Sequence, residues 1–315
     1  MDVDVEELRA HLAAQYGIRV EAMLTLDESV VLMRRTDGPN WVARVFPPSR
    51  PLSAVSADAE ILAWLADQDY PAERCATDDP VSVMDGRAVL VTEAVRSVPL
   101  SERRAAIKDA GGLRRFGELL AILAKLPTPE GAPSRPGGAW HHMTDGAPAH
   151  ELAAARTWLE EAEERAPARE LGAYGSIYAE LEALDDGTGL PQAFIHSDFV
   201  LANAVATPEH GIVLVDWAGS GRGPRVWALA FLLWAEASKD PRRAALAFAG
   251  YRSQLELEPE EVRRLGTIIR ARPLIFDIWR LRNGSKSARD VAADILDTQA
   301  LAAEIARRVA EQVRG

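Results

Sequence analysis

Three polar residues interrupt an apolar stretch of the chain and carry the chemistry of a metal or proton-transfer site. They are Asp198, Asn203 and Asp216, in the segment FIHSDFVLANAVATPEHGIVLVDW, residues 194–217. An amide oxygen beside a carboxylate is a pair of hard oxygen donors of the kind that Mg²⁺ prefers. Asp198 lies five residues before Asn203 and can reach the same space without being a ligand. The surrounding elements must therefore bring the three side chains together.

The stretch from Asn203 to Asp216 is predicted to be a β-hairpin. NAVATPEHGIVLVD contains two β-like runs around the turn TPEHG. With the turn centred near residues 209–210, antiparallel pairing puts Asn203 opposite Asp216, with their Cβ atoms about 5 Å apart. The apolar strands then act as a rigid frame, and the polar residues lie where the frame ends. The alternative is a buried hairpin capped by Asp and Asn, which accounts for the polar residues singly but not for all three followed by Trp217.

This pattern resembles the aminoglycoside phosphotransferase/choline kinase family, whose members are relatives of the protein kinases. That family has His-Gly-Asp, four residues, Asn, and then a strand that ends in Asp-Trp or Asp-Phe. HSDFVLAN followed by VLVDW is similar in order and spacing. The resemblance implies that Asp198 is the catalytic base for a substrate hydroxyl and that Asn203 and Asp216 hold the metal. It also implies a structural role for His196 at the start of the loop.

The N-terminal part resembles the nucleotide-binding half of the same family. WVARVF has the form of the strand that carries a phosphate-binding base, with Arg44 where Lys is commoner, and Glu60 in AEILAWL is implied as its ion-pair partner. VLVTEAV resembles the hinge strand whose backbone meets adenine, at Glu93 and Ala94. In the glycine-free turn TLDESVV, Ser29 is expected to donate to a phosphate. A surface arginine and an exposed helix glutamate are the alternative for Arg44 and Glu60.

Two positions depart from the family pattern near the expected catalytic loop. Ser197 stands where Gly is usual. Trp227 stands where an Asp that braces the loop is frequent.

The elements predicted around these residues form two lobes. Residues 1–97 read as an N-terminal helix, an antiparallel sheet and one inserted helix, and residues 98–315 read as mostly helical. The fold class predicted is α+β, a two-lobed protein-kinase-like fold with a small antiparallel-sheet N-lobe and a larger helical C-lobe. Four late helices are expected near 225–238, 241–254, 258–282 and 286–313. The short connection from Asp216 to the helix near Val226 leaves no room for a long activation segment, which argues against a protein kinase switched by phosphorylation of such a loop.

Composition narrows the class of protein. The 315 residues carry a net charge of −11, and the sequence pI is about 5.2, which argues against nucleic-acid binding. Cys75 is the single cysteine, so no intrachain disulfide forms and a reducing compartment fits. Neither a signal-peptide core nor a membrane-spanning apolar run is present in the sequence, so we expect a cytoplasmic protein.

The function implied by the resemblance is that of a small-molecule kinase, of which an antibiotic-modifying phosphotransferase is one form. The expected donor is ATP or GTP with Mg²⁺, and the expected partners are this nucleotide and a hydroxylated small molecule. A non-catalytic nucleotide- or ligand-binding protein on the same fold is the main alternative, motivated by the glycine-free turn. A purely structural helical protein is the third reading.

The acceptor is the least determined part. Acidic residues occur where the pocket wall should form: Asp145, Glu151, Glu160, Glu236 and Asp277. However, the helical lobe has a net charge of only −3, against −8 for residues 1–97, so a polycation gains little there. Trp140, Trp234 and Trp279 are predicted to line a partly apolar pocket instead. We therefore favour a less charged hydroxylated metabolite, sugar or other antibiotic over a polycationic aminoglycoside.

Overall fold

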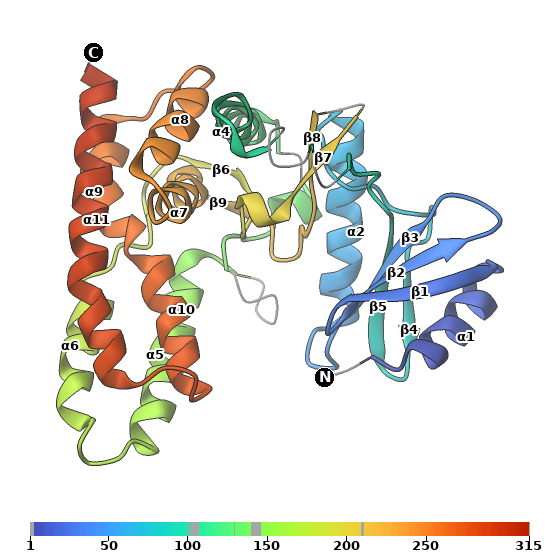
Figure 1. The fold of residues 1–315 in the computed structure, drawn as a ribbon, viewed down its shortest axis with the longest axis horizontal. Coiled ribbons are helices and arrows are strands. Elements are labelled where there is room, and N and C mark those ends of the chain that lie inside the picture. The colour runs from blue at the N-terminus through green and yellow to red at the C-terminus, as the bar shows by residue number, and fades with distance from the viewer. Residues whose placement is uncertain are drawn as a thin grey trace. The chain divides into compact units, whose positions relative to one another are not determined.

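The protein folds as two compact units in the computed structural model (Figure 1). The structure describes residues 3–99, 102, 107–128, 130–139, 146–208 and 211–314. Unit 1 comprises Met1–Ala106, Glu130–Pro133 and Asn203–Ala218. Unit 2 comprises Ile107–Pro129, Ser134–Ala202 and Gly219–Gly315. The predicted lobes were contiguous, whereas unit 1 takes the segment 203–218 from late in the chain.

Unit 1 is built on an antiparallel sheet, as predicted. Its strands run in the order β1-β2-β3-β5-β4. Their bounds are Val20–Asp27 (β1), Val30–Arg35 (β2), Trp41–Val45 (β3), Val81–Met84 (β4) and Arg87–Glu93 (β5). Helix α1 (Val5–Tyr16) precedes the sheet, and helix α2 (Leu52–Asp67) is inserted between β3 and β4. Asp4 caps the start of α1 with its side chain, and Gly17 ends it at a φ of 65°, which glycine adopts without strain.

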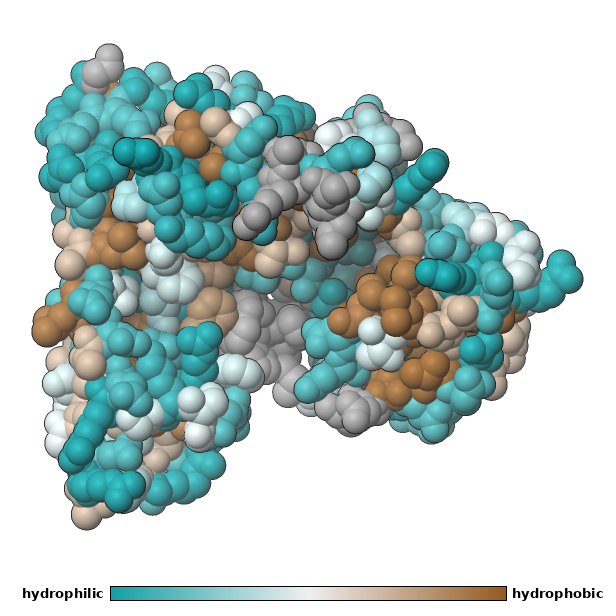
Figure 2. Space-filling model, in the orientation of Figure 1, coloured by the Kyte–Doolittle hydropathy of each residue, from teal (hydrophilic) through white to brown (hydrophobic). Residues whose placement is uncertain are grey.

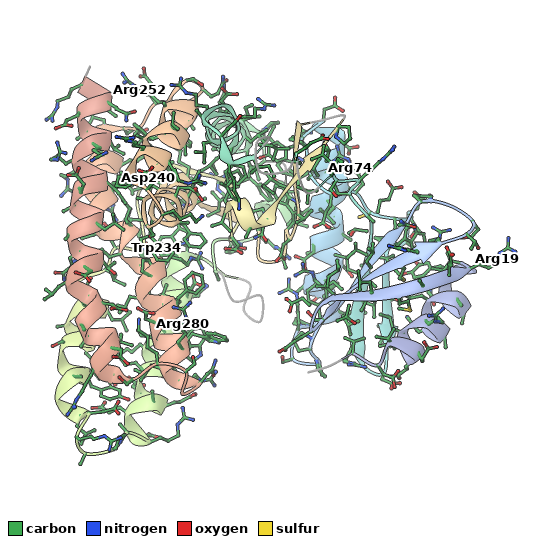
Figure 3. The ribbon with its side chains drawn as sticks, in the orientation of Figure 1. Arg19, Arg74, Trp234, Asp240, Arg252 and Arg280 are labelled. Carbon is green, nitrogen blue, oxygen red and sulfur yellow. The ribbon has the colours of Figure 1, made fainter. Side chains whose placement is uncertain are left out.

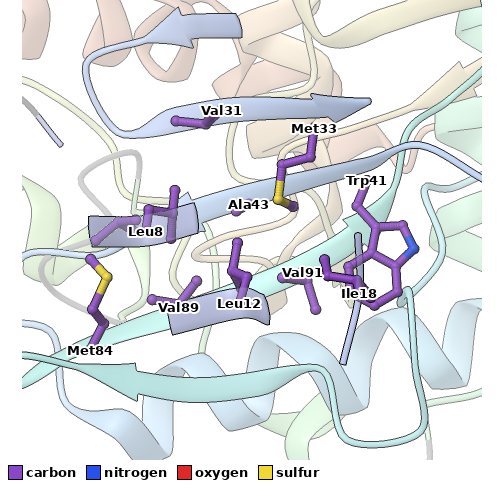
Figure 4. Packing of buried hydrophobic residues seen from close by; sticks show 11 residues of the cluster. Leu8, Leu12, Ile18, Val31, Met33, Trp41, Ala43, Met84, Val89 and Val91 are labelled. Atoms are coloured by element: carbon purple, nitrogen blue, oxygen red, sulfur yellow. The ribbon is translucent and has the colours of Figure 1, made fainter. Parts of the chain in front are cut away.

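The alternation of residues along the strands divides the sheet of unit 1 into two faces. One face packs against Leu8 and Leu12 of α1 and forms a fully buried core (Figure 4). On β3, Ala43 belongs to that core, so its neighbours Val42 and Arg44 point to the other face. Arg44 is therefore presented on the face that α1 does not cover.

Large apolar side chains remain on the surface of unit 1. Figure 2 shows hydrophobic patches over its β-strands. Leu24 and Leu26 on β1 are 55% and 54% exposed. Single exposed apolar residues are ordinary, but a patch of them is a feature of binding surfaces.

The hairpin that carries the metal-site candidates has a register different from the one predicted. β7 (Ala204–Thr207) pairs with β8 (Gly211–Leu214), and Ala204 lies opposite Leu214. Asn203 is therefore opposite Val215, whose amide donates to the Asn203 carbonyl at 3.0 Å, and the pairing of Asn203 with Asp216 was wrong by one residue. The reason is Gly211, whose φ of 72° lets β8 begin one residue earlier than expected.

Unit 2 is mostly helical. Its helices are α4 (Ala110–Lys125), α5 (Pro148–Glu164), α6 (Leu171–Glu182), α7 (Arg225–Ala237), α8 (Pro241–Arg252), α9 (Pro259–Ile269), α10 (Ala271–Arg282) and α11 (Ala288–Arg314). A two-stranded sheet pairs β6 (Gln192–Ile195) with β9 (Gly221–Pro224). One-turn helices span Ala132–Ser134 and Leu201–Asn203, at points where the chain passes from one unit to the other. The single helix expected over 258–282 is two helices, because Pro273 has no amide hydrogen and its ring crowds the carbonyl of Ile269. No helix among the described residues is long and apolar enough to cross a membrane.

Helices α4 and α8 of unit 2 pack backbone against backbone. A Cβ atom added to Gly117 on α4 would lie 1.8 Å from the Ala247 carbonyl oxygen, and one added to Gly250 on α8 would lie 1.9 Å from the Arg114 carbonyl oxygen. Backbone atoms cannot move aside as a flexible side chain can. Both glycines are thus required by the closeness of the two helices.

This packing yields a stability prediction. We expect Gly117→Ala to lower the free energy of unfolding by about 1–3 kcal/mol, because the added methyl group overpacks the contact with α8. The matched control is Gly175→Ala on α6, where nothing lies within 4 Å and where alanine should stabilise the helix by about 0.5–1 kcal/mol. Urea denaturation measures both changes. An unfolding free energy for Gly117→Ala equal to or above that of the wild type would contradict the packing described.

Candidate active site

Arg44 and Asp216, far apart in the sequence, meet in unit 1. Their side chains form an ion pair with 2.7 Å between Nη1 of Arg44 and Oδ1 of Asp216. Both side chains are largely but not fully buried. Asp216 has a φ of 69°, in the left-handed region that aspartate tolerates better than most residues. The chain thus turns sharply just after β8 and directs the Asp216 carboxylate toward β3.

Glu73 fixes the position of this turn. Its Oε1 accepts the backbone amide of Asp216 at 2.8 Å, and its Oε2 accepts the hydroxyl of Thr92 at 3.1 Å. The backbone around Glu73 also runs beside β8, since the Glu73 amide donates to the Leu214 carbonyl and the Leu214 amide donates to the Pro71 carbonyl. One carboxylate therefore ties the turn at Asp216 to β5 of the sheet.

The charges of this cluster affect one another. Burial raises the pKa of Glu73 above its usual range, even though Arg44 and the Asp216 amide act to lower it. Burial alone would lower the pKa of Arg44, but Asp216 and Glu73 outweigh it and raise that pKa above its usual value. Arg44 therefore stays charged, and its charge is what makes two nearby carboxylates tolerable.

Glu60, which was predicted to be the ion-pair partner of Arg44, does not pair with it, and that prediction was wrong. Glu60 is exposed on α2, and the ion pair of Arg44 is with Asp216. The acid of α2 that faces inward is Asp58, which precedes the buried Ile61 by three residues and so shares its helical face. Asp58 lines the same small cavity as Arg44, but its 2.8 Å ion pair is with the buried Arg50. A comparison of the helical faces of α2 would have pointed to Asp58, whereas no local pattern singled out Glu73.

An apolar strip crosses the sheet on the face that carries Arg44. The strand register places four residues side by side on β1, β2, β3 and β5: Leu24, Leu32, Val42 and Thr92. Leu32 and Val42 are half-buried, and Leu24 is more than half exposed. Leu90 and Phe46 extend this surface into the cavity beside Arg44. A flat apolar molecule attached to an anion would find matching surfaces here.

The other predicted nucleotide-binding positions lie at two edges of unit 1. Ser29 is in the turn between β1 and β2, and its carbonyl accepts the Val45 amide at 2.9 Å. At the end of β5, the Glu93 amide donates to the Arg74 carbonyl and the Ala94 amide donates to the Asn40 carbonyl, both at 2.8 Å. The amides of Glu93 and Ala94 are therefore both bonded within unit 1.

Asp198, the predicted base, lies in unit 2, on a loop that follows β6. It is half-buried, and its neighbours on both sides, Ser197 and Phe199, are buried. His196 is fully buried, and its Nδ1 accepts the backbone amide of Asp198 at 3.0 Å. The Phe199 ring packs against Phe116 of α4, with ring centroids 4.5 Å apart. The residues around Asp198 are thus held by the core of unit 2.

A buried arginine braces the same loop. Arg272 on α10 donates to the Ser197 carbonyl and to the Gly138 carbonyl, both at 2.9 Å, and pairs with Glu151 of α5 at 2.8 Å. Trp227, at the position where the family often has Asp, donates its indole N–H to the same Gly138 carbonyl at 3.1 Å. The loop therefore has a polar brace, supplied by a different residue. In the sequence, Arg272, Phe276 and Trp279 lie at i, i+4 and i+7 and so share one face of the helix. An arginine on this otherwise apolar face was the signal.

Several sequence-predicted residues cannot be added to these clusters. Trp140 and Asp145 lie outside the described residues. Asp198 belongs to unit 2, and Asn203 and Asp216 belong to unit 1. The catalytic and metal-binding roles assigned to them stay predictions.

The brace at Arg272 can be tested by its effect on stability. We expect Arg272→Met to lower the free energy of unfolding by about 3–5 kcal/mol, because it leaves the Glu151 carboxylate buried without its ion pair. The double variant with Glu151→Gln should recover part of this loss. Arg156→Met is the control, since its ion pairs with Glu160 and Glu182 are exposed and worth about 0–1 kcal/mol. Equal losses for Arg272→Met and Arg156→Met in urea denaturation would refute the brace.

Comparison with known proteins gives a family and several structural relatives. Residues 26–265 match the model of the phosphotransferase enzyme family. A search of curated protein sequences found no match. The fold is similar to an amicoumacin kinase solved in complex with AMP-PNP, Ca²⁺ and Ami (14% identity, TM-score 0.66, covering 97% of this chain and 94% of that chain).

Two other solved structures are similar over nearly their whole length. One is a microcompartment-associated aminopropanol kinase (19% identity, TM-score 0.62, covering 97% of this chain and 98% of that chain). The other is a macrolide 2'-phosphotransferase from Brachybacterium faecium (19% identity, TM-score 0.59, covering 92% of this chain and 98% of that chain). These identities establish a shared fold, and the family match covers more than half of the chain. The resemblance predicted from HSDFVLAN and VLVDW is confirmed: the chain belongs to the phosphotransferase enzyme family, the small-molecule kinases that phosphorylate hydroxyl groups.

Proposed function

We propose that the protein transfers the γ-phosphoryl group of ATP or GTP to a hydroxyl group of a small molecule, in a reaction that requires Mg²⁺. The observation that carries the proposal is the 2.7 Å contact between Arg44 and Asp216. The resemblance assigned Arg44 to phosphate and Asp216 to the metal, and the two residues come from segments more than 170 positions apart in the chain. Their meeting is what a site for a metal-bound nucleotide phosphate requires.

Unit 1 supplies the groups that the nucleotide needs. The strip of Leu24, Leu32 and Val42 offers an apolar surface for the base. Arg44 carries five N–H donors, so it can hold Asp216 and a phosphate oxygen together. Ser29 lies in the turn just before Val30, and Val30 pairs with Arg44 across the sheet. This closeness to Arg44 supports the assignment of Ser29 to a phosphate. The assignment of Glu93 and Ala94 to the base requires their backbone carbonyls or a shift of the Ala94 amide away from Asn40.

The residues at the end of the hairpin fit Mg²⁺. Two arginines and three carboxylates gather here, which leaves one net negative charge when Glu73 is ionised: Arg44, Arg50, Asp58, Glu73 and Asp216. Among the described residues no three His, Cys, Asp or Glu side chains are grouped to hold a metal by themselves. Mg²⁺ is commonly held by one or two protein oxygens with phosphate and water, so Asp216 and Asn203 would suffice. When bound, the metal neutralises charge on the phosphates.

Asp198 is assigned to the acceptor. Its carboxylate takes the proton of the acceptor hydroxyl as that oxygen bonds to the γ-phosphorus, and the nucleoside diphosphate leaves. His196 has a structural role, since its buried ring accepts the Asp198 amide. Arg272 positions the loop through the Ser197 carbonyl.

A non-catalytic nucleotide-binding protein is the second candidate. Two observations favour it: the turn at Ser29 has no glycine to approach phosphates closely, and the Ala94 amide is bonded to Asn40. Magnesium-dependent nucleotide hydrolysis by the purified wild type would exclude it.

The role of Asp198 leads to a kinetic prediction. We expect Asp198→Asn to lower phosphoryl transfer by about 10²–10⁴-fold, because the general base is lost, while Mg²⁺-ATP binding stays unchanged. Nucleotide consumption against a panel of hydroxylated metabolites and antibiotics measures the first, and calorimetric titration measures the second. Near-normal turnover in this variant would refute the assignment.

The role of Glu73 leads to a second prediction. Glutamine at this position has one acceptor oxygen, so it cannot accept both the Asp216 amide and the Thr92 hydroxyl, and it removes a charge beside Arg44. We expect Glu73→Gln to weaken Mg²⁺-ATP binding by about 10- to 100-fold, the value of a hydrogen bond to a charged group. Glu60→Gln on the exposed side of α2 is the matched control and should change binding by less than about twofold. Equal affinities of the two variants would contradict the role of Glu73 in holding the site.

A further inference from the structure

An aromatic stripe runs along two helices of unit 2 and begins at the loop that carries Asp198. On α7 its members are Trp227, Phe231 and Trp234, and on α10 they are Arg272, Phe276 and Trp279, each set at i, i+4 and i+7. Residues at this spacing lie on one face of a helix. We call these six residues the α7/α10 stripe.

Contacts between the two helices make the stripe continuous. The guanidinium of Arg272 lies 4.9 Å from the ring centre of Phe231. Phe276 lies 5.7 Å from Phe231 and 6.4 Å from Trp234, and the rings of Phe231 and Trp234 are stacked at 5.9 Å. Because Arg272 also donates to the Ser197 carbonyl, the inner end of the stripe is one residue from Asp198.

Burial decreases along the stripe away from the loop. Trp227 and Arg272 are each 2% exposed, whereas Trp234, Phe276 and Trp279 are half-buried. Figure 3 labels Trp234 on α7 and Arg280 on α10. Arg280 directly follows Trp279 in the sequence. Seven residues of helix separate Arg272 from Trp279, a distance of about 10 Å. A molecule longer than a single sugar could lie on this surface while one of its hydroxyls reaches Asp198.

The carboxylates of α7 and α10 lie off the face of the stripe and are already neutralised. The sole carboxylate of α7, Glu236, is fully buried and pairs with Arg243 and Lys239. The sole carboxylate of α10, Asp277, pairs with Lys286 at 2.7 Å and with Arg280 at 3.4 Å. Glu236 is therefore out of reach of a surface ligand, and a polycation would have to displace two basic side chains before it could pair with Asp277.

We propose that the acceptor is an uncharged, hydroxylated small molecule with an extended apolar or aromatic face, bound along the α7/α10 stripe. The proposal rests on the proposed kinase function for the presence of an acceptor, but the surface itself can be tested by binding. Trp234 and Phe276 determine specificity by contact with the apolar face, and α7 and α10 add no unpaired carboxylate that would favour a polycation.

Three probes separate the possible chemistries. 4-Nitrophenyl β-D-glucopyranoside is neutral and has hydroxyls and an aromatic face, methyl β-D-glucopyranoside has the hydroxyls alone, and kanamycin is a polycation. We expect the nitrophenyl glucoside to bind the wild type at least about 10-fold more tightly than the methyl glucoside, because its ring can stack on an aromatic side chain. Kanamycin should bind least at 150 mM salt. Calorimetry or tryptophan fluorescence measures the three affinities.

Variants locate the binding surface. Trp234→Leu keeps an apolar contact with Phe231 and should abolish the preference for the nitrophenyl glucoside, with unfolding checked by circular dichroism. Trp158→Leu on α5, a half-buried tryptophan near Arg282, is the control and should keep the preference. The second variant Phe276→Leu should behave as Trp234→Leu does.

Two results would overturn the proposal. One is tighter binding of kanamycin than of the nitrophenyl glucoside, with an affinity that falls steeply with salt. The other is equal binding, or no binding, of the two glucosides. Mg²⁺-dependent ATP hydrolysis, measured on the same samples, tests the kinase function separately. If hydrolysis is absent but the preference for the nitrophenyl glucoside is intact, the kinase function is refuted and the binding surface is still supported.

Discussion

The hydrogen bond from the Asp216 amide to Glu73 is the contact on which the rest of unit 1's site depends. Asp216 adopts a left-handed backbone conformation, which persists only where neighbouring groups hold it. Glu73 holds it at 2.8 Å and is itself held by Thr92 of β5. The side-chain carboxylate of Asp216 then pairs with Arg44. Without the bond, the turn would lose its side-chain tie to β5, and Asp216 would be held against the sheet by its ion pair with Arg44 alone.

In unit 2, a buried cation holds the loop that carries Asp198 in place. Arg272 donates to two backbone carbonyls and is charge-balanced by Glu151, both residues being at most 2% exposed. Burying a charge of this kind lowers the stability of the fold unless an ion-pair partner and hydrogen-bond acceptors surround it. Its benefit is geometric, because a guanidinium fork fixes several acceptors at once. The same residue begins the α7/α10 stripe, so the loop of Asp198 and the surface proposed for the acceptor share one anchor.

The sequence was sufficient for the features that depend on local patterns. The two-part architecture, the β-hairpin around residue 209 and the family of the chain could all be predicted, because they follow from periodicity, turn residues and a motif of fixed spacing. The misses have physical reasons. The register at Asn203 depended on the φ of Gly211, and the break between α9 and α10 depended on Pro273. Glu73 acts through long-range hydrogen bonds, which no local pattern indicates, whereas for Arg272 the only local signal was an arginine on the apolar face of its helix.

The central claim is that Arg44 and Asp216 form one grip for a metal-bound nucleotide. The most direct test is calorimetric titration of the wild type with ATP, once with Mg²⁺ and once with EDTA. Asp58, Glu73 and Asp216 repel an unaccompanied triphosphate, so we predict binding at least about 10-fold tighter with Mg²⁺, or about 1.4 kcal/mol. Equal or tighter binding in EDTA would contradict the account.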